Sequence, residues 1–254
     1  MASRSKGLSA HADPATVNAL LQRDGLVMFE GVHGRAAVVR LARRLVVPWQ
    51  HRDAEPDGVT VISDRGPMAE QPGFAGFGAG ELSPHTESSA LAVPPRMLLL
   101  MCGSPAACGG ESLVVDGAAV YRDLSSDPDV IARLRQPRSV QFAPGRWGSI
   151  FANTADGNMA LRLRLRLDDL AHFTEPVHAV LPTLIGAIRR HQRLLPLKTG
   201  EGFLLDNRRM LHGRRSFTGQ SERVMYRVLG NPTADITLPT GFTVSGLALA
   251  APAC

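Results

Sequence analysis

The triplet His85-Thr86-Glu87 is the stretch from which the fold and the chemistry of this chain are best predicted. An imidazole and a carboxylate two residues apart project from the same face if the triplet lies on a strand. A second imidazole, His212, lies far downstream. Two histidines and one carboxylate are the ligand set that holds a non-haem ferrous ion on one face and leaves the other face open. We therefore predict that His85, Glu87 and His212 are catalytic metal ligands that meet in space.

The region around and after His212 predicts an anion site beside this metal. His212 lies in the run of residues 206–214, which follows a buried strand, and Gly213 is expected to form a turn. Arg223 follows His212 by eleven positions, a separation that allows one hairpin and places Arg223 beside the metal. Arg227 shares a strand face with Arg223 because their spacing is even. An arginine inside a barrel needs an anion, and its planar fork matches the carboxylate of a 2-oxo-acid cosubstrate.

Short apolar runs separated by turn residues dominate the chain and predict strands. These strands are expected at residues 25–29, 96–102, 112–115, 140–142, 149–151, 160–167, 202–206 and 223–229. Helices are expected at residues 15–23, 35–45, 118–124, 127–134 and 182–194, three of them beginning at Asp13, Asp116 and Asp127. Many short strands with few helices predict a mainly β fold with flanking helices and a double-stranded β-helix, or jelly-roll, core.

The sequence has no convincing linker, which predicts a single domain over residues 1–254. Its jelly-roll core is expected at roughly residues 80–235, with the N-terminal helices packed outside it. Residues 48–80 are rich in Pro, Gly, Asp and Glu and contain few long apolar runs. Loops of this length in a compact domain are usually functional or disordered. Because this loop leads directly into His85, we predict that it forms the rim of an active site.

The composition bounds the classes of protein to which this chain can belong. Of the 254 residues, 44% are hydrophobic and 20% charged, as in ordinary globular proteins. No apolar run approaches the roughly 20 residues that cross a bilayer, and the polar start predicts neither a secretory signal nor a membrane partner. Three cysteines predict no disulfide framework, which favours the cytoplasm. The net charge is +5, but aromatic residues are only 5%, so an anionic small molecule is favoured over nucleic acid.

Several other residues are interpreted as structural. The remaining histidines are taken as surface or hydrogen-bonded core residues: His11, His33, His51, His172, His178 and His191. Residues 161–167 alternate strictly between leucine and arginine, which places the arginines at 162, 164 and 166 on one face. A solvated strand face is the favoured interpretation, and contact of these arginines and of residues 58–80 with substrate is the alternative. Cys102 lies in an apolar run and is expected in the core.

Several ordered motifs together resemble the taurine dioxygenase and clavaminate synthase-like group of Fe(II)/2-oxoglutarate-dependent oxygenases. The resemblance runs from about Pro84 to Leu229, more than half of the chain. Its motifs are His85-Thr86-Glu87, Pro94-Pro95-Arg96, Gly109-Gly110-Glu111-Ser112, Asp206-Asn207-Arg208-Arg209, Leu211-His212-Gly213-Arg214 and Arg223-Val224-Met225-Tyr226-Arg227. Such a series in order is more specific than any one of its members.

The resemblance implies a role for each matching residue. His85, Glu87 and His212 would ligate Fe(II), and Arg223 would pair with the distal carboxylate of 2-oxoglutarate. Ser112 stands where the family often has a threonine that helps to hold this carboxylate, and it keeps the hydroxyl. Arg227 would lie near the same pocket, where some members bind an anionic group of the substrate. The retained carboxylate of Glu87 argues against a halogenase, which gives up this ligand to make room for chloride.

The resemblance also implies a function. We expect an oxygenase that uses Fe(II), 2-oxoglutarate and O2 to hydroxylate an unactivated C–H bond of an amino acid or a natural-product intermediate, free or carrier-bound. Desaturation, cyclisation or epimerisation are alternative outcomes on the same scaffold. A cupin-like dioxygenase or isomerase without 2-oxoglutarate is the main rival, followed by an inactive binding protein and a nucleic-acid oxygenase. The sequence does not indicate the oligomeric state.

Overall fold

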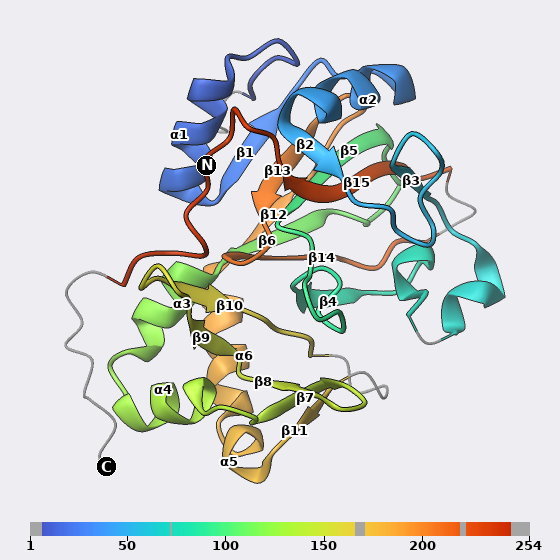
Figure 1. Cartoon of the computed structure of the whole chain (residues 1–254). Helices are drawn as coiled ribbons and strands as arrows, with labels where there is room; N and C mark the ends of the chain where they lie inside the picture. Colours follow the sequence, from blue (N-terminus) through green and yellow to red (C-terminus); the bar gives the residue numbers. More distant parts are fainter. Residues whose placement is uncertain (1–6, 72, 166–170, 219–221, 245–254) are drawn as a thin grey trace.

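Two antiparallel sheets form the centre of the molecule (Figure 1). The structure is a computed structural model that describes residues 7–71, 73–165, 171–218 and 222–244. The first sheet has the order β1 (Leu26–Phe29), β13 (Gly202–Asp206), β5 (Met97–Ser104), β15 (Val224–Pro232) and β2 (Val46–Pro48), with β3 (Val59–Ile62) also paired to β15. The second has the order β12 (Gln192–Leu195), β6 (Ser112–Asp116), β14 (Met210–Arg214) and β4 (Leu82–His85). This pair of sheets is the jelly-roll core, so the predicted fold class is confirmed.

The alternation of side chains along β5 shows how the first sheet separates two cores. Met97, Leu99 and Met101 pack against the helices α1 (Pro14–Asp24) and α2 (Gly34–Leu45). Leu98, Leu100 and Cys102 point to the opposite side, where they pack with Val114 of the second sheet. Both faces of β5 are therefore buried, which explains why its sequence is continuously apolar. Cys102 is a buried core residue, as predicted.

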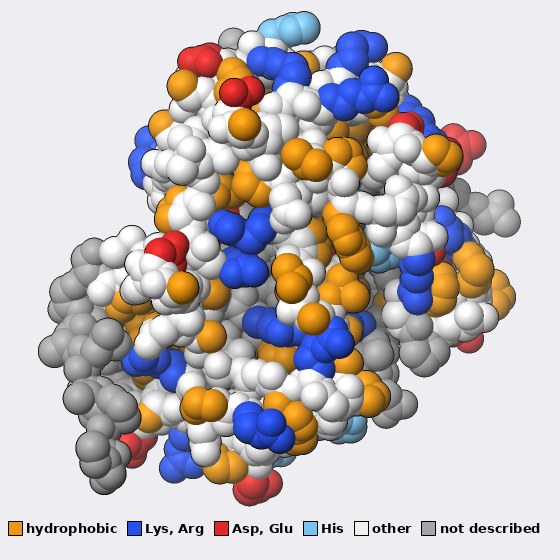
Figure 2. All heavy atoms as spheres, in the orientation of Figure 1, with side chains coloured by type: hydrophobic (Ala, Val, Ile, Leu, Met, Phe, Trp, Pro, Cys, Tyr) orange, Lys and Arg blue, Asp and Glu red, His pale blue; other side chains and the backbone are white. Residues whose placement is uncertain are grey.

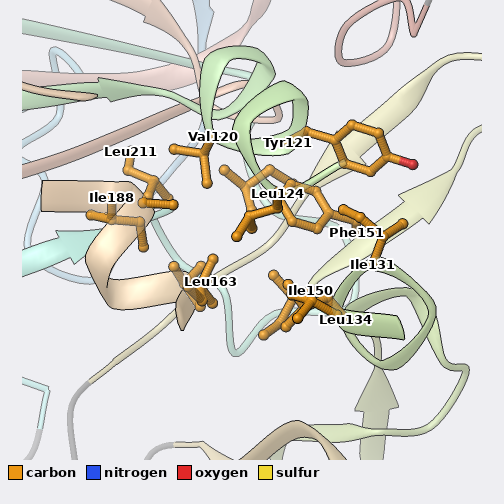
Figure 3. Close-up of a cluster of buried hydrophobic side chains, with 14 of the residues drawn as sticks. Val120, Tyr121, Leu124, Ile131, Leu134, Ile150, Phe151, Leu163, Ile188 and Leu211 are labelled. Atoms are coloured by element: carbon orange, nitrogen blue, oxygen red, sulfur yellow. The ribbon is translucent and has the colours of Figure 1, made fainter. Parts of the chain in front are cut away.

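A second group of elements covers the outer face of the second sheet (Figure 1). It contains the helices α3 (Gly117–Leu124), α4 (Pro128–Arg135), α5 (Glu175–His178) and α6 (Leu181–His191). Its short strands are β7 (Val140–Ala143), β8 (Arg146–Gly148), β9 (Phe151–Asn153), β10 (Met159–Leu161) and β11 (His172–Phe173). Figure 3 shows Leu211 of β14 beside Val120 and Ile188 of this group. In the same cluster, Phe151 meets Tyr121 edge to face with ring centroids 5.0 Å apart.

Three aspartates begin helices as the sequence predicts. The side chains of Asp13, Asp116 and Asp127 each accept a hydrogen bond from a backbone N–H in the first turn. These bonds satisfy donors that have no partner within the helix. No helix among the described residues combines the length and the apolar character that a membrane crossing needs.

The predicted strand at residues 160–167 is wrong at residues 162–165. β10 ends at Leu161, residues 162–165 are irregular, and residues 166–170 lie outside the described part of the chain. The polar backbone groups of Leu163 are bonded to Thr86 rather than to a neighbouring strand. The rim at residues 48–80 also differs from a plain loop, because it contains β3 and the short 3-10 helices η1 (Gly66–Glu70) and η2 (Ala75–Phe77).

The predicted turn at Gly213 and the hairpin after it are also wrong. Gly213 lies within β14, and β14 and β15 belong to different sheets, so the intervening segment crosses from one sheet to the other. A side chain at Gly213 would collide with the carbonyl oxygen of Leu82 on β4. The close approach of two strands, and not a turn, therefore requires glycine here.

Candidate active site

A cavity of about 470 Å³ lies between the two sheets. Leu98, Leu100, Met225 and Arg227 line it from the first sheet, while Ser112 and His212 line it from the second. Residues of the segment 48–80 also line it, namely Trp49, His51, Arg52, Ile62, Gly73, Ala75 and Gly76. The segment therefore contributes to the wall of the cavity, and its role as a rim stays a prediction.

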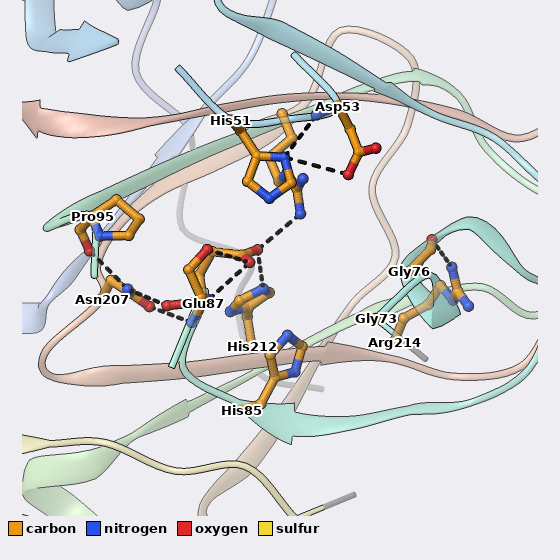
Figure 4. A network of polar contacts seen from close by, with 12 residues as sticks. His51, Asp53, Gly73, Gly76, His85, Glu87, Pro95, Asn207, His212 and Arg214 are labelled. Atoms are coloured by element: carbon orange, nitrogen blue, oxygen red, sulfur yellow. Dashed lines mark hydrogen bonds and ion pairs between the residues drawn. The ribbon is translucent and has the colours of Figure 1, made fainter. Parts of the chain in front are cut away.

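The three predicted metal ligands come together in this cavity (Figure 4). Their ligand atoms all lie within 4.8 Å of one another. His212 on β14 is the cross-strand partner of His85 at the end of β4, and the centroids of the two rings are 4.3 Å apart. Glu87 differs from the expectation because β4 ends at His85. Glu87 therefore approaches from the turn beyond the strand, and the shared strand face that the sequence predicts is not what brings it there.

The two histidines have features that suit a metal ligand. His85 Nδ1 lies 2.9 Å from the carbonyl oxygen of Ser83, so an Nδ1–H that donates there leaves Nε2 for a metal. His212 Nδ1 is buried without a hydrogen-bond partner. Burial, followed by the electrostatic interaction with His212, lowers the pKa of His85 to about 3. The imidazole is consequently neutral at ordinary pH, which is the form that binds metals, and the set fits Fe(II).

Arg227 keeps Glu87 ionised. Arg227 Nη1 donates to Glu87 Oε2 at 3.0 Å, and His212 Nε2 lies 3.7 Å from the same oxygen. The other carboxylate oxygen, Oε1, accepts from the backbone N–H of Ser88 at 3.0 Å. Burial raises the pKa of Glu87, but Arg227 and His212 outweigh burial and hold it well below the ordinary value. A carboxylate in this state is ready to act as an anionic ligand.

Asn207 holds the backbone of Glu87 in place through hydrogen bonds of its side chain. Its Oδ1 accepts from the N–H of Glu87 at 2.6 Å, and its Nδ2 donates to the carbonyl oxygens of Glu87 at 3.0 Å and Pro95 at 2.8 Å. Asn207 itself is buried. One amide therefore uses both of its ends to hold the ligand-bearing turn in place.

We expect Asn207→Ala to weaken metal binding by roughly 10–100-fold, the range typical of outer-shell partners of ligands. The cause is the loss of three bonds that orient the turn carrying Glu87. Fe(II) affinity, measured by anaerobic titration, checks this expectation. Asn153→Ala removes an exposed asparagine of β9 and serves as the control. Equal affinities of the two variants would show that Asn207 does not position the ligand.

A second group of residues lies along the same inner face and is suited to an anion. Arg214 is the cross-strand partner of Ser112, and it donates to the carbonyl oxygens of Gly76 and Gly80. The guanidinium groups of Arg214 and Arg223 lie 5.1 Å and 5.5 Å from the ring centroid of Phe217. Burial, followed by repulsion from Arg223, lowers the pKa of Arg214 to about 10.

Burial also lowers the pKa of Arg223, which lies deep in the same wall. Among the described residues that line the cavity, Glu87 is the single carboxylate, and it is already held by Arg227. Among the described residues, no carboxylate forms an ion pair with Arg214 or Arg223, although the charge of Asp64 acts on Arg214. The two buried guanidinium groups therefore favour an anionic ligand.

The sequence analysis missed three residues of this site. Arg214 was not assigned, although its even spacing from His212 on one strand could have placed both on one face. Asn207 was noted within a motif but was given no role. His51 was assigned to the surface or hydrogen-bonded core histidines, whereas it lines the cavity and is partly buried. No pattern in the sequence predicts that His51 lines the cavity, because its position depends on how residues 48–80 run in the folded chain.

The row of arginines after β10 is not the solvated face that the sequence favoured. Arg162 is half buried and donates to the carbonyl oxygens of Ser89 and Leu91, and its guanidinium lies 4.2 Å from the ring centroid of Phe142. Arg164 lines the cavity, and Arg166 lies outside the described residues. The arginines at 162 and 164 therefore hold and line the wall of the cavity.

Asp206, next to Asn207, predicts a pH dependence of stability. Burial raises its pKa to about 6 despite a hydrogen bond from the backbone N–H of Arg208. A carboxyl with a raised pKa binds its proton more tightly in the folded state, so it destabilises the fold as pH rises from about 4 through 6. We expect Asp206→Asn to match the wild type near pH 4 and to exceed its unfolding free energy by up to about 3 kcal/mol at pH 7.

Urea denaturation of both proteins from pH 4 to pH 7 measures this difference. Two unfolding free energies that stay parallel over the whole range would contradict the role of Asp206.

A family model described as "Taurine catabolism dioxygenase TauD, TfdA family" matches residues 5–229. The human gamma-butyrobetaine dioxygenase is 25% identical over 169 residues, which cover 58% of this chain. The same match covers 42% of the human protein, so the matched part is less than half of that relative. The gamma-butyrobetaine dioxygenase of Pongo abelii matches to the same extent.

Solved structures share the fold. An asparagine oxygenase (AsnO) superposes with a TM-score of 0.70 at 20% identity, covering 92% of this chain and 86% of that chain. The non-heme iron oxygenase OrfP, in complex with Fe, succinate and (3S)-hydroxy-L-Arg, superposes with a TM-score of 0.63 at 16% identity. The match covers 85% of this chain and 80% of that chain.

Proposed function

This chain belongs to the taurine catabolism dioxygenase TauD, TfdA family, and we propose that it is an Fe(II)- and 2-oxoglutarate-dependent oxygenase. Its reaction would be the hydroxylation of an unactivated C–H bond. The observation that carries the proposal is the convergence of His85, Glu87 and His212 in a cavity that also contains buried arginines. The single-domain organisation and the cytoplasmic location expected from the sequence belong to the same proposal.

Each of the three side chains would contribute one ligand atom to the metal. His85 would offer the ring nitrogen that faces away from Ser83, and Glu87 would offer a carboxylate that Arg227 keeps ionised. His212 would complete the set from the neighbouring strand. Bound Fe(II), together with 2-oxoglutarate and O2, supplies the oxidising power for removal of a hydrogen atom and its replacement by a hydroxyl group. The protein contributes position, orientation and exclusion of water.

Arg223, Ser112 and Arg214 would bind the distal carboxylate of 2-oxoglutarate. Arg223 supplies a buried guanidinium, and Arg214 lies directly across the ladder from the Ser112 hydroxyl. Apolar surroundings strengthen each of these charge-assisted bonds relative to water. Arg227 donates to Glu87 and also lines the cavity, so it would guide either the cosubstrate or an anionic group of the substrate.

The substrate would be a small molecule of the amino-acid class, free or bound to a carrier. The support is the content of similar structures, namely (2S,3S)-3-hydroxyasparagine with succinate and (3S)-hydroxy-L-Arg with Fe and succinate. A cavity of about 470 Å³ is large enough for a ligand of this size. Alternative outcomes such as desaturation or cyclisation would use the same residues.

A turnover screen tests this function. The Fe(II)-loaded protein is incubated with 2-oxoglutarate, O2 and a panel of free and carrier-bound amino acids, and succinate and product masses are measured. We expect succinate to form with at least one product that is heavier by a single oxygen atom. Product formation that does not require 2-oxoglutarate would instead favour a cupin-like enzyme and would contradict the proposal.

A further inference from the structure

The carboxylate of Glu87 lies close to several hydrogen-bond donors. Figure 2 shows that Lys and Arg side chains gather over the middle of one face of the molecule, while the Asp and Glu side chains in view lie mostly nearer its edge. Glu87 is the one carboxylate of the described metal set. The donors that bond to each of its oxygens therefore decide which oxygen remains available to a metal.

The two oxygens of Glu87 have different partners (Figure 4). Oε2 accepts from Nη1 of Arg227 at 3.0 Å and lies 3.7 Å from Nε2 of His212. Oε1 accepts from Ser88 twice, from its backbone N–H at 3.0 Å and from its hydroxyl at 3.2 Å. Oε2 is therefore the oxygen beside a histidine ligand, and Oε1 is held by the next residue of the chain.

The number of oxygens that Glu87 gives to a metal matters for the chemistry of the site. A carboxylate can bind a cation through one oxygen or through both. Two histidines and one carboxylate leave positions open on non-haem Fe(II) for the reactants. A second oxygen from Glu87 would take one of these positions. Donors that hold Oε1 away from the metal would therefore keep the position open.

The backbone of Ser88 has an unusual conformation for a serine. Its φ is 53°, in the left-handed region that residues other than glycine adopt rarely. Several hydrogen bonds fix the turn around it. The carbonyl oxygen of Ser88 accepts from Leu91 N–H at 3.0 Å, that of Ser89 accepts from Nε of Arg162 at 2.8 Å, and Asn207 holds the preceding residue. Contacts of this kind maintain strained residues, which cluster at functional sites.

The hydroxyl explains why a serine stands at this position. Glycine would adopt the same backbone conformation at a lower cost, because it has no Cβ. A serine adds only a hydroxymethyl group to glycine, and here the hydroxyl is bonded to Oε1 of Glu87. Ser88 also lines the cavity. The bond to Glu87 is therefore what the chain gains from a serine where the backbone favours glycine.

We propose that Ser88 is a positioning residue that holds Oε1 of Glu87, so that the metal is bound through Oε2 alone. This inference rests on the proposed oxygenase function and gives a task in the metal site to a residue that is not a ligand. Loss of the hydroxyl would leave Oε1 with the backbone N–H of Ser88 as its donor. Oε1 would then approach the metal more easily and occupy an open position. Metal affinity should therefore be kept or rise, while 2-oxoglutarate affinity falls.

The different directions of these two affinities test the inference. Co(II) is the probe in place of Fe(II), because its visible absorption depends on the number and kind of its ligands. Co(II) and then 2-oxoglutarate are titrated into the wild type and into Ser88→Gly. For Ser88→Gly we expect an altered Co(II) absorption, Co(II) binding at least as tight as in the wild type, and roughly tenfold weaker 2-oxoglutarate binding, the effect of one hydrogen bond to a charged group. A purely structural role would weaken both affinities together.

Stability measurements separate the hydroxyl from the backbone. Ser88→Gly should be at least as stable as the wild type in urea, because glycine relieves the left-handed strain. Ser88→Thr keeps the hydroxyl but adds a β-branch, which is disfavoured at positive φ. It should be less stable and still keep the Co(II) absorption and 2-oxoglutarate affinity of the wild type. Arg138→Gly is the matched control, because Arg138 is exposed, has a φ of 56° and does not line the cavity. It should leave both affinities unchanged.

A Ser88→Gly protein with the Co(II) absorption and the 2-oxoglutarate affinity of the wild type would overturn the inference. So would a variant in which both affinities fall together. The proposed function is checked separately in the wild type. If 2-oxoglutarate does not bind to the metal-loaded wild type, the function is wrong, and the Co(II) absorption still decides the role of Ser88. If it binds to the wild type and equally well to Ser88→Gly, only the role of Ser88 is wrong.

Discussion

Replacement of His212 by alanine is expected to remove Fe(II) binding and, with it, all measurable turnover. His212 supplies one of three donors whose ligand atoms lie within 4.8 Å of one another, and its loss leaves two donors. Loss of an outer-shell partner already weakens metal binding roughly 10–100-fold, so loss of a direct ligand should cost more than about 100-fold. Fe(II) binding by anaerobic titration and succinate formation are the two measurements. His85→Ala should behave in the same way.

The control for these variants is His178→Ala, which removes an exposed histidine at the end of α5. It should retain Fe(II) binding and succinate formation. Denaturation curves of all variants separate loss of metal from loss of fold, because His212 is buried and its replacement can also affect stability. A folded His212→Ala protein with wild-type succinate formation would remove the metal set from the mechanism.

Replacement of Arg223 by alanine is expected to weaken 2-oxoglutarate binding by roughly 30- to 4000-fold. Truncating one partner of a buried charge pair costs about 2–5 kcal/mol, and this free energy corresponds to that range of affinity. Arg223 is buried beside Arg214, so the variant leaves one guanidinium where two would face the distal carboxylate. Calorimetric titration of 2-oxoglutarate into the Fe(II) protein measures the change, while Fe(II) binding itself should persist.

Two further variants define the role of Arg223. Arg215→Ala removes an exposed arginine next to Arg214 and should leave the 2-oxoglutarate affinity intact. Arg223→Lys should recover part of the affinity, because an ammonium keeps the charge but loses the two parallel hydrogen bonds. Equal 2-oxoglutarate affinities of Arg223→Ala and Arg215→Ala would place the cosubstrate elsewhere.

The parts of the fold that could be predicted from the sequence are those with a local physical signal. The aspartate caps and the continuous apolar run of β5 are examples, because capping bonds and burial on two faces leave a mark within a few residues. The strand predicted over residues 160–167 is wrong at residues 162–165, although the alternation of leucine and arginine there is strict. Hydrogen bonds between Leu163 and Thr86, residues far apart in sequence, replace a strand partner there.

In the site, too, features with a local signal could be predicted, and features that depend on residues far apart in sequence could not. The ligand types and their order indicated the metal set, and the convergence of His85 with His212 follows from their pairing across β4 and β14. The approach of Glu87 from beyond the strand could not be predicted, since it depends on the turn that Asn207 holds. The need for glycine at position 213 could not be predicted for the same reason. It depends on the carbonyl oxygen of Leu82, which is far away in the sequence but close in space.

The most direct test of the metal centre is an anomalous difference map, recorded at the iron absorption edge, from crystals of the Fe(II)-loaded protein. Our account predicts one strong peak in the cavity, bounded by a nitrogen of His85, a nitrogen of His212 and a carboxylate oxygen of Glu87. A cavity without an iron peak, or an iron bound by other side chains, would contradict it.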